Sequence, residues 1–161
     1  MGRWRLYLAT GLCALLQGVV LMYISLWGVF PVLLPGLVCL IGLQCGPDRG
    51  AECGLLGGAL LFLAGATPWQ MALLTLFGGL SGALFHKSGG FWGNWLACLP
   101  GLAGYEGLQI LGHWLLGAGW LAPLRVAGPE LLLAAACVPL AQGVLWAVSP
   151  HQRRRRRRSV S

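Results

Sequence analysis

Three polar residues lie close together in an otherwise apolar stretch of the second half of the chain. Glu106, Gln109 and His113 stand at positions i, i+3 and i+7, a spacing that puts their side chains on one face of a helix. A charge deep inside a membrane-spanning helix is costly, so such a residue usually faces the protein interior or a partner. This face predicts either a polar pocket or docking stripe, or a protonated core Glu106 held by hydrogen bonds, and the residues alone leave both open.

The other residues that could do chemistry are too few and too scattered to form an active site. Among the four acids, Asp48, Glu52, Glu106 and Glu130, only Glu106 falls deep in an apolar segment. The sequence shows no carboxylate pair, no G-x-S-x-G, no H-E-x-x-H and no phosphate-binding glycine loop. Catalysis needs a positioned acid, base or nucleophile with an orienting partner. We therefore expect a protein that is not an enzyme, binds no metal and uses no cofactor.

The cysteines give no sign of a metal site. None of the six forms a C-x-x-C pair, and no His lies at zinc spacing from them. Most fall in apolar segments, where Cys behaves as a small hydrophobic residue. Cys45 and Cys53 flank a loop and could approach each other, but a disulfide is not expected there because the loop is predicted to be cytoplasmic.

Composition favours a membrane protein. Hydrophobic residues make up 57% of the 161 residues and charged residues only 9%, against roughly 25% charged residues in soluble domains. Much of the net charge of +7 comes from a terminal run that contains only arginines: Arg153, Arg154, Arg155, Arg156, Arg157 and Arg158. Such a run stays on the cytoplasmic side and can bind the anionic inner leaflet, at about 1 kcal/mol per basic residue. A single terminal block lacks the interleaved basic face of a nucleic-acid binder, so nucleic acid is not expected.

Six apolar segments near the length of a bilayer span follow one another. They predict an all-α membrane protein, with a six-helix transmembrane bundle over residues 1–149 and a cytoplasmic polybasic tail over 150–161. The first segment is taken as an uncleaved span because no small-residue cleavage site precedes Trp27. The predicted spans cover residues 6–26, 29–45, 51–65, 68–85, 94–116 and 129–148.

Turn and cap residues set these boundaries. Pro35 is expected to bend the second span, and residues 46–50 read as a turn by composition. Thr67 and Pro68 read as the N-cap and first residue of the fourth span, and Asn94 as the cap of the fifth. Residues 117–128 are expected to be a connection. Pro129 and Glu130 then start the sixth span, with the acid complementing the helix dipole.

The basic residues fix the orientation. With six spans, ten basic residues share one side: Arg3, Arg5, Arg49, Lys87 and the six tail arginines. Only Arg125 falls on the other side. Because cytoplasmic loops carry the excess of Lys and Arg, both termini are predicted to be cytoplasmic in a multi-pass membrane protein.

Small and aromatic residues predict how the helices meet each other and the bilayer. Gly54 with Gly58, and Gly78 with Gly82, are spaced four apart on two consecutive spans. Small residues at this spacing let helix backbones approach, so spans three and four are expected to cross closely there. A subunit interface is the alternative. Seven of the eight Trp lie near predicted span ends, as in an interfacial belt.

The stretch from Gly54 to Pro68, followed by Ala72-Leu73-Leu74 and the glycines between Gly78 and Gly82, resembles the bacterial rod-shape-determining MreD family. In that family a "G-L-x-x-G-L-x-x-D" helix precedes a small-residue turn and an "A-L" helix. Phe62 stands at the family's acidic position, so no role of that acid is carried over. The resemblance implies a non-enzymatic partner of MreC in the cell-elongation machinery that guides peptidoglycan synthesis.

Two other families resemble the chain in size and layout. MreD proteins are similar to the S components of energy-coupling-factor vitamin transporters, so the bundle is expected to be S-component-like. On that alternative, Glu106, Gln109 and His113 would line a substrate pocket, and Ala9 and Cys13 would contact the transporter module. The Trp content is also similar to that of tryptophan-rich sensory proteins, but their signature segments are not evident, and five spans would break the charge asymmetry.

Overall fold

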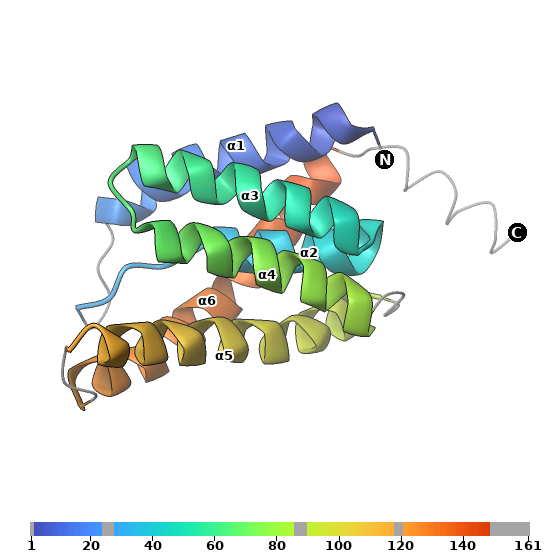
Figure 1. Ribbon diagram of the computed structural model, residues 1–161. Helices are drawn as coiled ribbons and strands as arrows, with labels where there is room; N and C mark the ends of the chain where they lie inside the picture. Colours follow the sequence, from blue (N-terminus) through green and yellow to red (C-terminus); the bar gives the residue numbers. More distant parts are fainter. Residues whose placement is uncertain (1, 24–27, 86–89, 118–120, 149–161) are drawn as a thin grey trace, which may run out of the picture.

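The computed structural model describes residues 2–23, 28–85, 90–117 and 121–148, and these ranges contain helices and no strand. Figure 1 shows their arrangement. The all-α part of the predicted fold is therefore confirmed. The helices are α1 (Arg3–Val19), the short 3₁₀ helix η1 (Leu21–Tyr23), α2 (Leu34–Cys45), α3 (Pro47–Leu63), α4 (Pro68–Phe85), α5 (Phe91–Leu115) and α6 (Leu121–Val148).

Successive α-helices run in alternating directions. α1, α3 and α5 begin at one end of the bundle, where α2, α4 and α6 finish, so the start of α1 and the end of α6 lie at the same end (Figure 1). We call this the basic end, because Arg3 and Arg5 start α1 there and Arg49 lies in the first turn of α3. Arg125 lies near the start of α6, at the opposite end.

Helix α2 forms the centre of the bundle and contacts each of the other five α-helices. Every residue from Leu33 to Leu43 is buried, so α2 is enclosed on all sides. Its 12 residues are about 18 Å long, which is shorter than the ~30 Å of a bilayer's hydrocarbon core. Residues 28–33 before it are not helical. The predicted second span of 29–45 is therefore only partly helix, and Pro35 lies in the first turn, where its missing N–H costs nothing, rather than at a bend.

Two further helix starts differ from the sequence prediction. α3 begins at Pro47, and only Gly46, with φ of 101°, separates it from α2, so residues 46–50 are not a turn. α5 begins at Phe91 after Gly90, with φ of 91°, and the predicted cap Asn94 is buried inside the helix. In both places a glycine at positive φ immediately precedes the first residue of the helix, a conformation that glycine adopts without strain. α4 does begin at Pro68, as predicted.

The largest difference concerns α6, which begins at Leu121 and has 28 residues. The predicted connection over 117–128 is therefore wrong for residues 121–128, and Pro129 lies inside the helix instead of starting it. Pro123 falls in the first turn, and Pro139 lies in the second half of the helix. Neighbouring helices can satisfy the backbone groups that an interior proline leaves without a partner, so apolar bundles tolerate it.

Within the described residues, the segment Leu124–Val148 is the one helix whose length and composition alone would suffice to cross a membrane, while Leu34–Cys45 is apolar but shorter. This supports association with a membrane.

Candidate functional site: core contacts, basic end and outer surface

The four glycines singled out in the sequence lie where α3 packs on α4. A Cβ added at Gly54 would lie 2.7 Å from the backbone carbonyl carbon of Leu74, and one at Gly58 would lie 2.6 Å from the Cα of Met71. The glycines of the two helices therefore face backbone of the opposite helix, with no room for a side chain. These contacts are within one chain, as expected of intramolecular packing.

Gly78 and Gly82 on α4 have further partners. A Cβ at Gly78 would lie 2.7 Å from the carbonyl carbon of Gly50, and one at Gly82 would lie 2.6 Å from the carbonyl oxygen of Gly42. Ser81, between them, is buried, and its hydroxyl lies 3.1 Å from the carbonyl oxygen of Cys39 on α2. The glycine contact thus joins three helices, α2, α3 and α4, and the sequence pattern identified only two of them.

A polar contact that the sequence analysis missed holds the start of α2. The side-chain oxygen of Gln17 on α1 accepts hydrogen bonds from the backbone N–H groups of Leu33 and Leu34, each at 3.0 Å. The first N–H groups of a helix have no partner inside the helix. Gln17 therefore supplies the cap that Leu33 cannot provide, because Leu33 has an apolar side chain. In the sequence, the only indication of this cap was a single amide side chain, that of Gln17, within an apolar segment.

The residues of the expected polar face on α5 differ in how deeply they are buried. Glu106 is buried, with 6% of its surface exposed, whereas His113 is exposed and its Nδ1 lies 2.8 Å from the backbone oxygen of Gln109. The Gln109 side chain is a hydrogen-bonding partner of the Tyr105 hydroxyl. The three residues therefore do not line one common pocket.

The partner of Glu106 corrects a second expectation. The Glu130 carboxyl of α6 is its hydrogen-bonding neighbour, so the described residues do contain a carboxyl pair. Glu130 could take this place because α6 begins at Leu121, which moves Glu130 from the first turn into the body of the helix.

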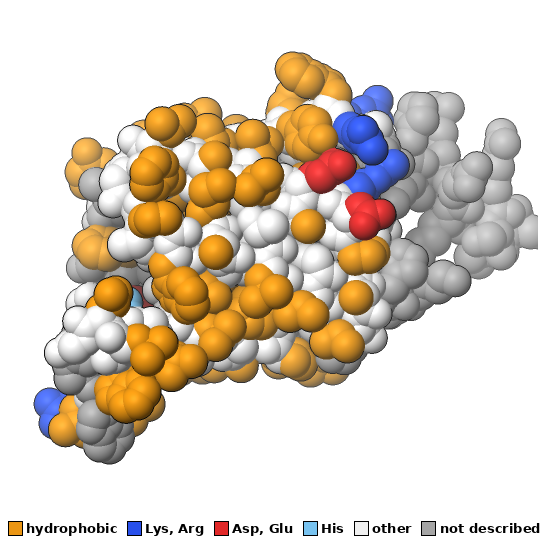
Figure 2. All heavy atoms as spheres, in the orientation of Figure 1, with side chains coloured by type: hydrophobic (Ala, Val, Ile, Leu, Met, Phe, Trp, Pro, Cys, Tyr) orange, Lys and Arg blue, Asp and Glu red, His pale blue; other side chains and the backbone are white. Residues whose placement is uncertain are grey.

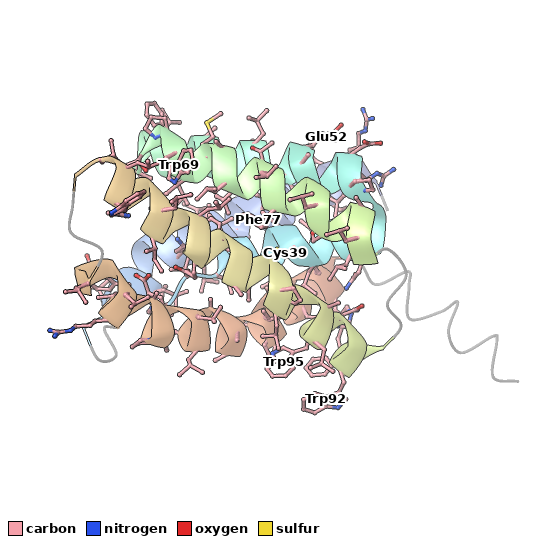
Figure 3. All side chains as sticks on the ribbon, turned by 60° about the horizontal axis from the view of Figure 1, so that its bottom comes forward. Cys39, Glu52, Trp69, Phe77, Trp92 and Trp95 are labelled. Atoms are coloured by element: carbon pink, nitrogen blue, oxygen red, sulfur yellow. The ribbon has the colours of Figure 1, made fainter. Side chains whose placement is uncertain are left out.

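At the basic end, Glu52 of α3 has two partners on α1. The Tyr7 hydroxyl donates a hydrogen bond to its carboxylate at 3.0 Å, and an Arg3 nitrogen lies 3.8 Å from it. Figure 3 places Glu52 near the end of the bundle. These contacts fix the relative positions of two helices that begin side by side. The ion pair is exposed and contributes little by itself.

An aromatic cluster covers another part of the same end, where α5 begins and α6 finishes. The ring of Phe91 lies 5.5 Å from that of Trp92 and 6.2 Å from that of Trp146, and Trp92 lies 6.1 Å from Trp95. The Trp95 indole donates a hydrogen bond to the backbone oxygen of Ala135 at 3.0 Å, which ties α5 to α6. In Figure 3, Trp92 points away from the bundle. The cluster is thus anchored at Trp95 and exposed at Trp92.

The sides of the bundle are apolar. Figure 2 shows apolar side chains spread over the middle of one face, with charged side chains near the ends. Exposed large apolar residues occur on α1 and on each of α3 to α6; examples are Leu8, Leu15, Leu55, Phe62, Leu76, Leu84, Leu96, Leu111, Leu132 and Leu140. Soluble monomers rarely expose contiguous apolar patches of more than a few hundred Å².

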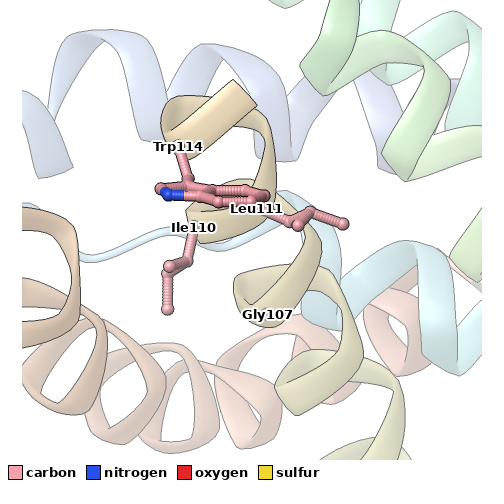
Figure 4. A pocket seen from close by; sticks show the side chains of 4 residues that line it. All are labelled: Gly107, Ile110, Leu111 and Trp114. Carbon is pink, nitrogen blue, oxygen red and sulfur yellow. The ribbon is translucent and has the colours of Figure 1, made fainter. Parts of the chain in front are cut away.

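One shallow hollow lies on this apolar surface, near the end of α5 (Figure 4). It measures about 450 Å³ and is lined by Gly107, Ile110, Leu111 and Trp114, at positions i, i+3, i+4 and i+7 of the helix. Its lining is almost entirely carbon, so it offers little to recognise a polar ligand.

Three other expectations need only a brief report. No disulfide joins the six cysteines, all of which belong to the described ranges, and Cys45 and Cys53 are not bonded. Ala9 and Cys13 of α1, expected to be available for a transporter module, are fully buried in the core. The tail arginines 153–158 and Lys87 lie outside the described residues.

No protein-family model, curated protein or solved structure matches this chain.

Proposed function

We propose that the protein is a six-span inner-membrane protein that acts without catalysis as a scaffold or regulatory subunit of the bacterial cell-elongation machinery, as its resemblance to MreD implies. It would meet partner membrane proteins, MreC among them, through lateral contacts between helices. The observation that carries this proposal is the apolar outer surface of the bundle. A helical bundle with apolar sides can contact both lipid and partner proteins laterally within the bilayer.

The distribution of charge supports the placement in the membrane. The described Arg, Asp and Glu side chains that are exposed or half-buried lie near the two ends, apart from Glu130, whose partner is Glu106. Alternating helix directions put Arg3, Arg5 and Arg49 at one end and Arg125 at the other, which is the asymmetry of a positive-inside protein. The short α2 also fits, because the non-helical residues 28–33 before it would complete the second span, and non-helical backbone is tolerated at membrane depth where protein encloses it.

A vitamin-binding S component is the alternative that the sequence left open, and the contacts of its expected pocket residues argue against it. A substrate pocket needs polar groups that point into a cavity. Here Glu106 already has Glu130 as partner and Gln109 has Tyr105, while the hollow on α5 is apolar. These contacts favour the scaffold over the transporter subunit.

The test is affinity purification of the tagged protein from mildly solubilised host membranes, with co-eluting proteins identified by mass spectrometry. Recovery of MreC or wall-elongation synthases is the expected result. Recovery of an ATPase pair with a transmembrane coupling subunit would overturn the scaffold proposal and establish the transporter alternative.

A pair of matched variants makes this test sharper. Gly58→Leu with Gly82→Leu fills two places where helix backbone leaves no room, and it should abolish partner recovery while the protein still inserts. Gly18→Leu with Gly143→Leu adds the same volume at exposed places with nothing within 4 Å and should leave recovery unchanged. Normal recovery with the first pair would show that this packing does not matter for assembly.

A further inference from the structure

We propose that α6 contains a hinge at Pro139 and that the indole of Trp95 holds this hinge closed. We call residues 140–148, the part of α6 beyond the hinge, the arm. Opening of the hinge moves the arm away from the core at the basic end of the bundle. Three features meet here: a backbone carbonyl that depends on a neighbouring helix, a buried amide oxygen without a partner, and an arm with little enclosed apolar contact. The proposal goes beyond the scaffold function and does not depend on it.

The first feature is the backbone carbonyl that Pro139 leaves without its helical partner. In an α-helix each N–H bonds to the carbonyl four residues earlier, so the missing N–H of Pro139 frees the carbonyl of Ala135. The proline ring also clashes with that carbonyl and turns it away from the helix. Trp95 of α5 donates its indole N–H to this same oxygen at 3.0 Å (Figure 3). The neighbouring helix thus supplies the hydrogen bond that α6 cannot make for itself.

The conformation of α6 at this point therefore depends on one contact that can be broken. Ala135 is buried, and a buried acceptor without a partner is costly. Sharp bends in helices occur at prolines, so release of the indole favours a bend at Pro139 that brings the freed carbonyl to another donor. Gly143, one turn further on, is a second weak helix former in the same stretch.

The second feature is the side chain of Gln142, in the first turn of the arm. Only 1% of its surface is exposed, and its Oε1 has no hydrogen-bond partner. A buried acceptor of this kind raises the free energy of the closed state, because water would supply donors to it. Gln142 lies six residues before Val148, so it is roughly 9 Å from the end of the helix. A short outward movement of the arm therefore brings Oε1 to water, which offsets part of the loss of the indole contact.

The third feature is the limited apolar contact that holds the arm. Its buried residues are Ala141, Gln142 and Leu145, and among these only Leu145 has a large apolar side chain. The Trp146 ring lies 6.2 Å from that of Phe91 on α5, but it is half-exposed. The enclosed surface of the arm is therefore small. Opening uncovers core surface at the basic end, and this changes what a partner membrane protein meets there.

Labelling of an introduced thiol measures the opening. Ala141→Cys and Ala134→Cys replace two buried alanines seven residues apart on one face of α6, one on each side of Pro139. The rate at which a water-soluble maleimide modifies each new thiol is measured in the full-length protein in detergent, and mass spectrometry of peptides separates it from the six native thiols. Trp95→Phe removes the indole donor and should speed up labelling at position 141 about tenfold, with little change at position 134. Gln142→Leu should slow labelling at position 141, because the closed state then buries no oxygen without a partner.

Pro139→Ala is the critical variant, because it returns an N–H group to the carbonyl of Ala135. In that background labelling at position 141 should slow down, and Trp95→Phe should no longer change it. Pro129→Ala, the matched control in the same helix, should leave the effect of Trp95→Phe intact.

An equal effect of Trp95→Phe with and without Pro139, or an equal acceleration at positions 134 and 141, would overturn the proposal. If Trp95→Phe fails to fold, Pro139→Ala alone still tests the hinge, and unchanged labelling at position 141 in that variant would refute it. Partner recovery from host membranes is measured separately, so failure of the hinge proposal is distinguishable from failure of the scaffold proposal.

Discussion

The side-chain oxygen of Gln17 lies 3.0 Å from the backbone nitrogen of Leu34, and this contact joins the first helix to the central one. The same oxygen also accepts from Leu33, so one amide group satisfies two backbone donors at the start of α2. Both contacts are partly buried, and a buried backbone donor without a partner is costly. The position of the buried centre of the bundle thus depends on one polar side chain of a neighbouring helix.

Gln17→Leu is expected to lower the free energy of unfolding by roughly 2–4 kcal/mol. Two backbone N–H groups lose their acceptor, at a cost of about 1–3 kcal/mol each, and relaxation of the surrounding structure recovers part of the total. The midpoint of SDS-induced unfolding in detergent micelles measures the loss. Hydrogen exchange at Leu33 and Leu34 should speed up at the same time. Gln17→Glu keeps an acceptor and should retain protection of these two amides; equal exchange in the two variants would contradict the capping role.

Gly54→Ala is expected to cost about 1–3 kcal/mol, because the new Cβ would lie 2.7 Å from one backbone atom of Leu74 and 2.8 Å from the Cα of Thr75. Backbone cannot move aside as a flexible side chain can. Gly93→Ala is the control: nothing lies within 4 Å of its Cβ, and alanine favours helix, so stability should hold or rise slightly. The same unfolding midpoint compares the two, and a Gly54→Ala protein as stable as the control would refute close packing of α3 on α4.

Glu106→Gln is expected to keep the stability of the bundle within about 1 kcal/mol, because the amide can still donate a hydrogen bond to Glu130. Glu106→Leu removes that donor and should lower the free energy of unfolding by roughly 1–3 kcal/mol more than Glu106→Gln does. Unfolding midpoints of both variants, measured in one buffer, give the difference. A Leu variant as stable as the Gln variant would mean that the pair contributes nothing to the contact of α5 with α6.

Reporter fusions test the number of spans. Alkaline phosphatase fused after Gly117, which follows α5, should be active, because this position is predicted to face outward. Green fluorescent protein fused after Gly46 or after the last residue should fluoresce, since both positions are predicted to be cytoplasmic. Phosphatase activity from the Gly46 fusion would contradict the alternation of six spans.

The sequence was informative where a residue's chemistry acts locally. Pro68 marked the start of α4 correctly because proline is favoured in a first helical turn. The glycine pairs pointed to the contact of α3 with α4, since small side chains matter wherever two backbones meet. The all-helical class followed from the long apolar segments of the sequence.

Sequence reasoning failed where the same residue type has two possible roles. Pro129 was taken as a helix start, yet Pro123 holds that role and Pro129 lies within α6. This error hid the Glu106–Glu130 pair, because it assigned Glu130 to a helix terminus. Likewise, the capping role of Gln17 depends on where α2 begins, and α2 begins only after the non-helical residues 28–33. No local sequence pattern separates these residues from the helix that follows.

The central position of α2 has a consequence for the biogenesis of the protein. The second segment leaves the ribosome before four of the five helices that enclose it have been made, and its helix is too short to cross the bilayer alone. Val138 of α6, which packs against Gly36, is synthesised about a hundred residues later. We therefore expect the early chain to stay incompletely packed until α6 has been made, so that the first half of the protein becomes resistant to proteases only after the last helix is in place.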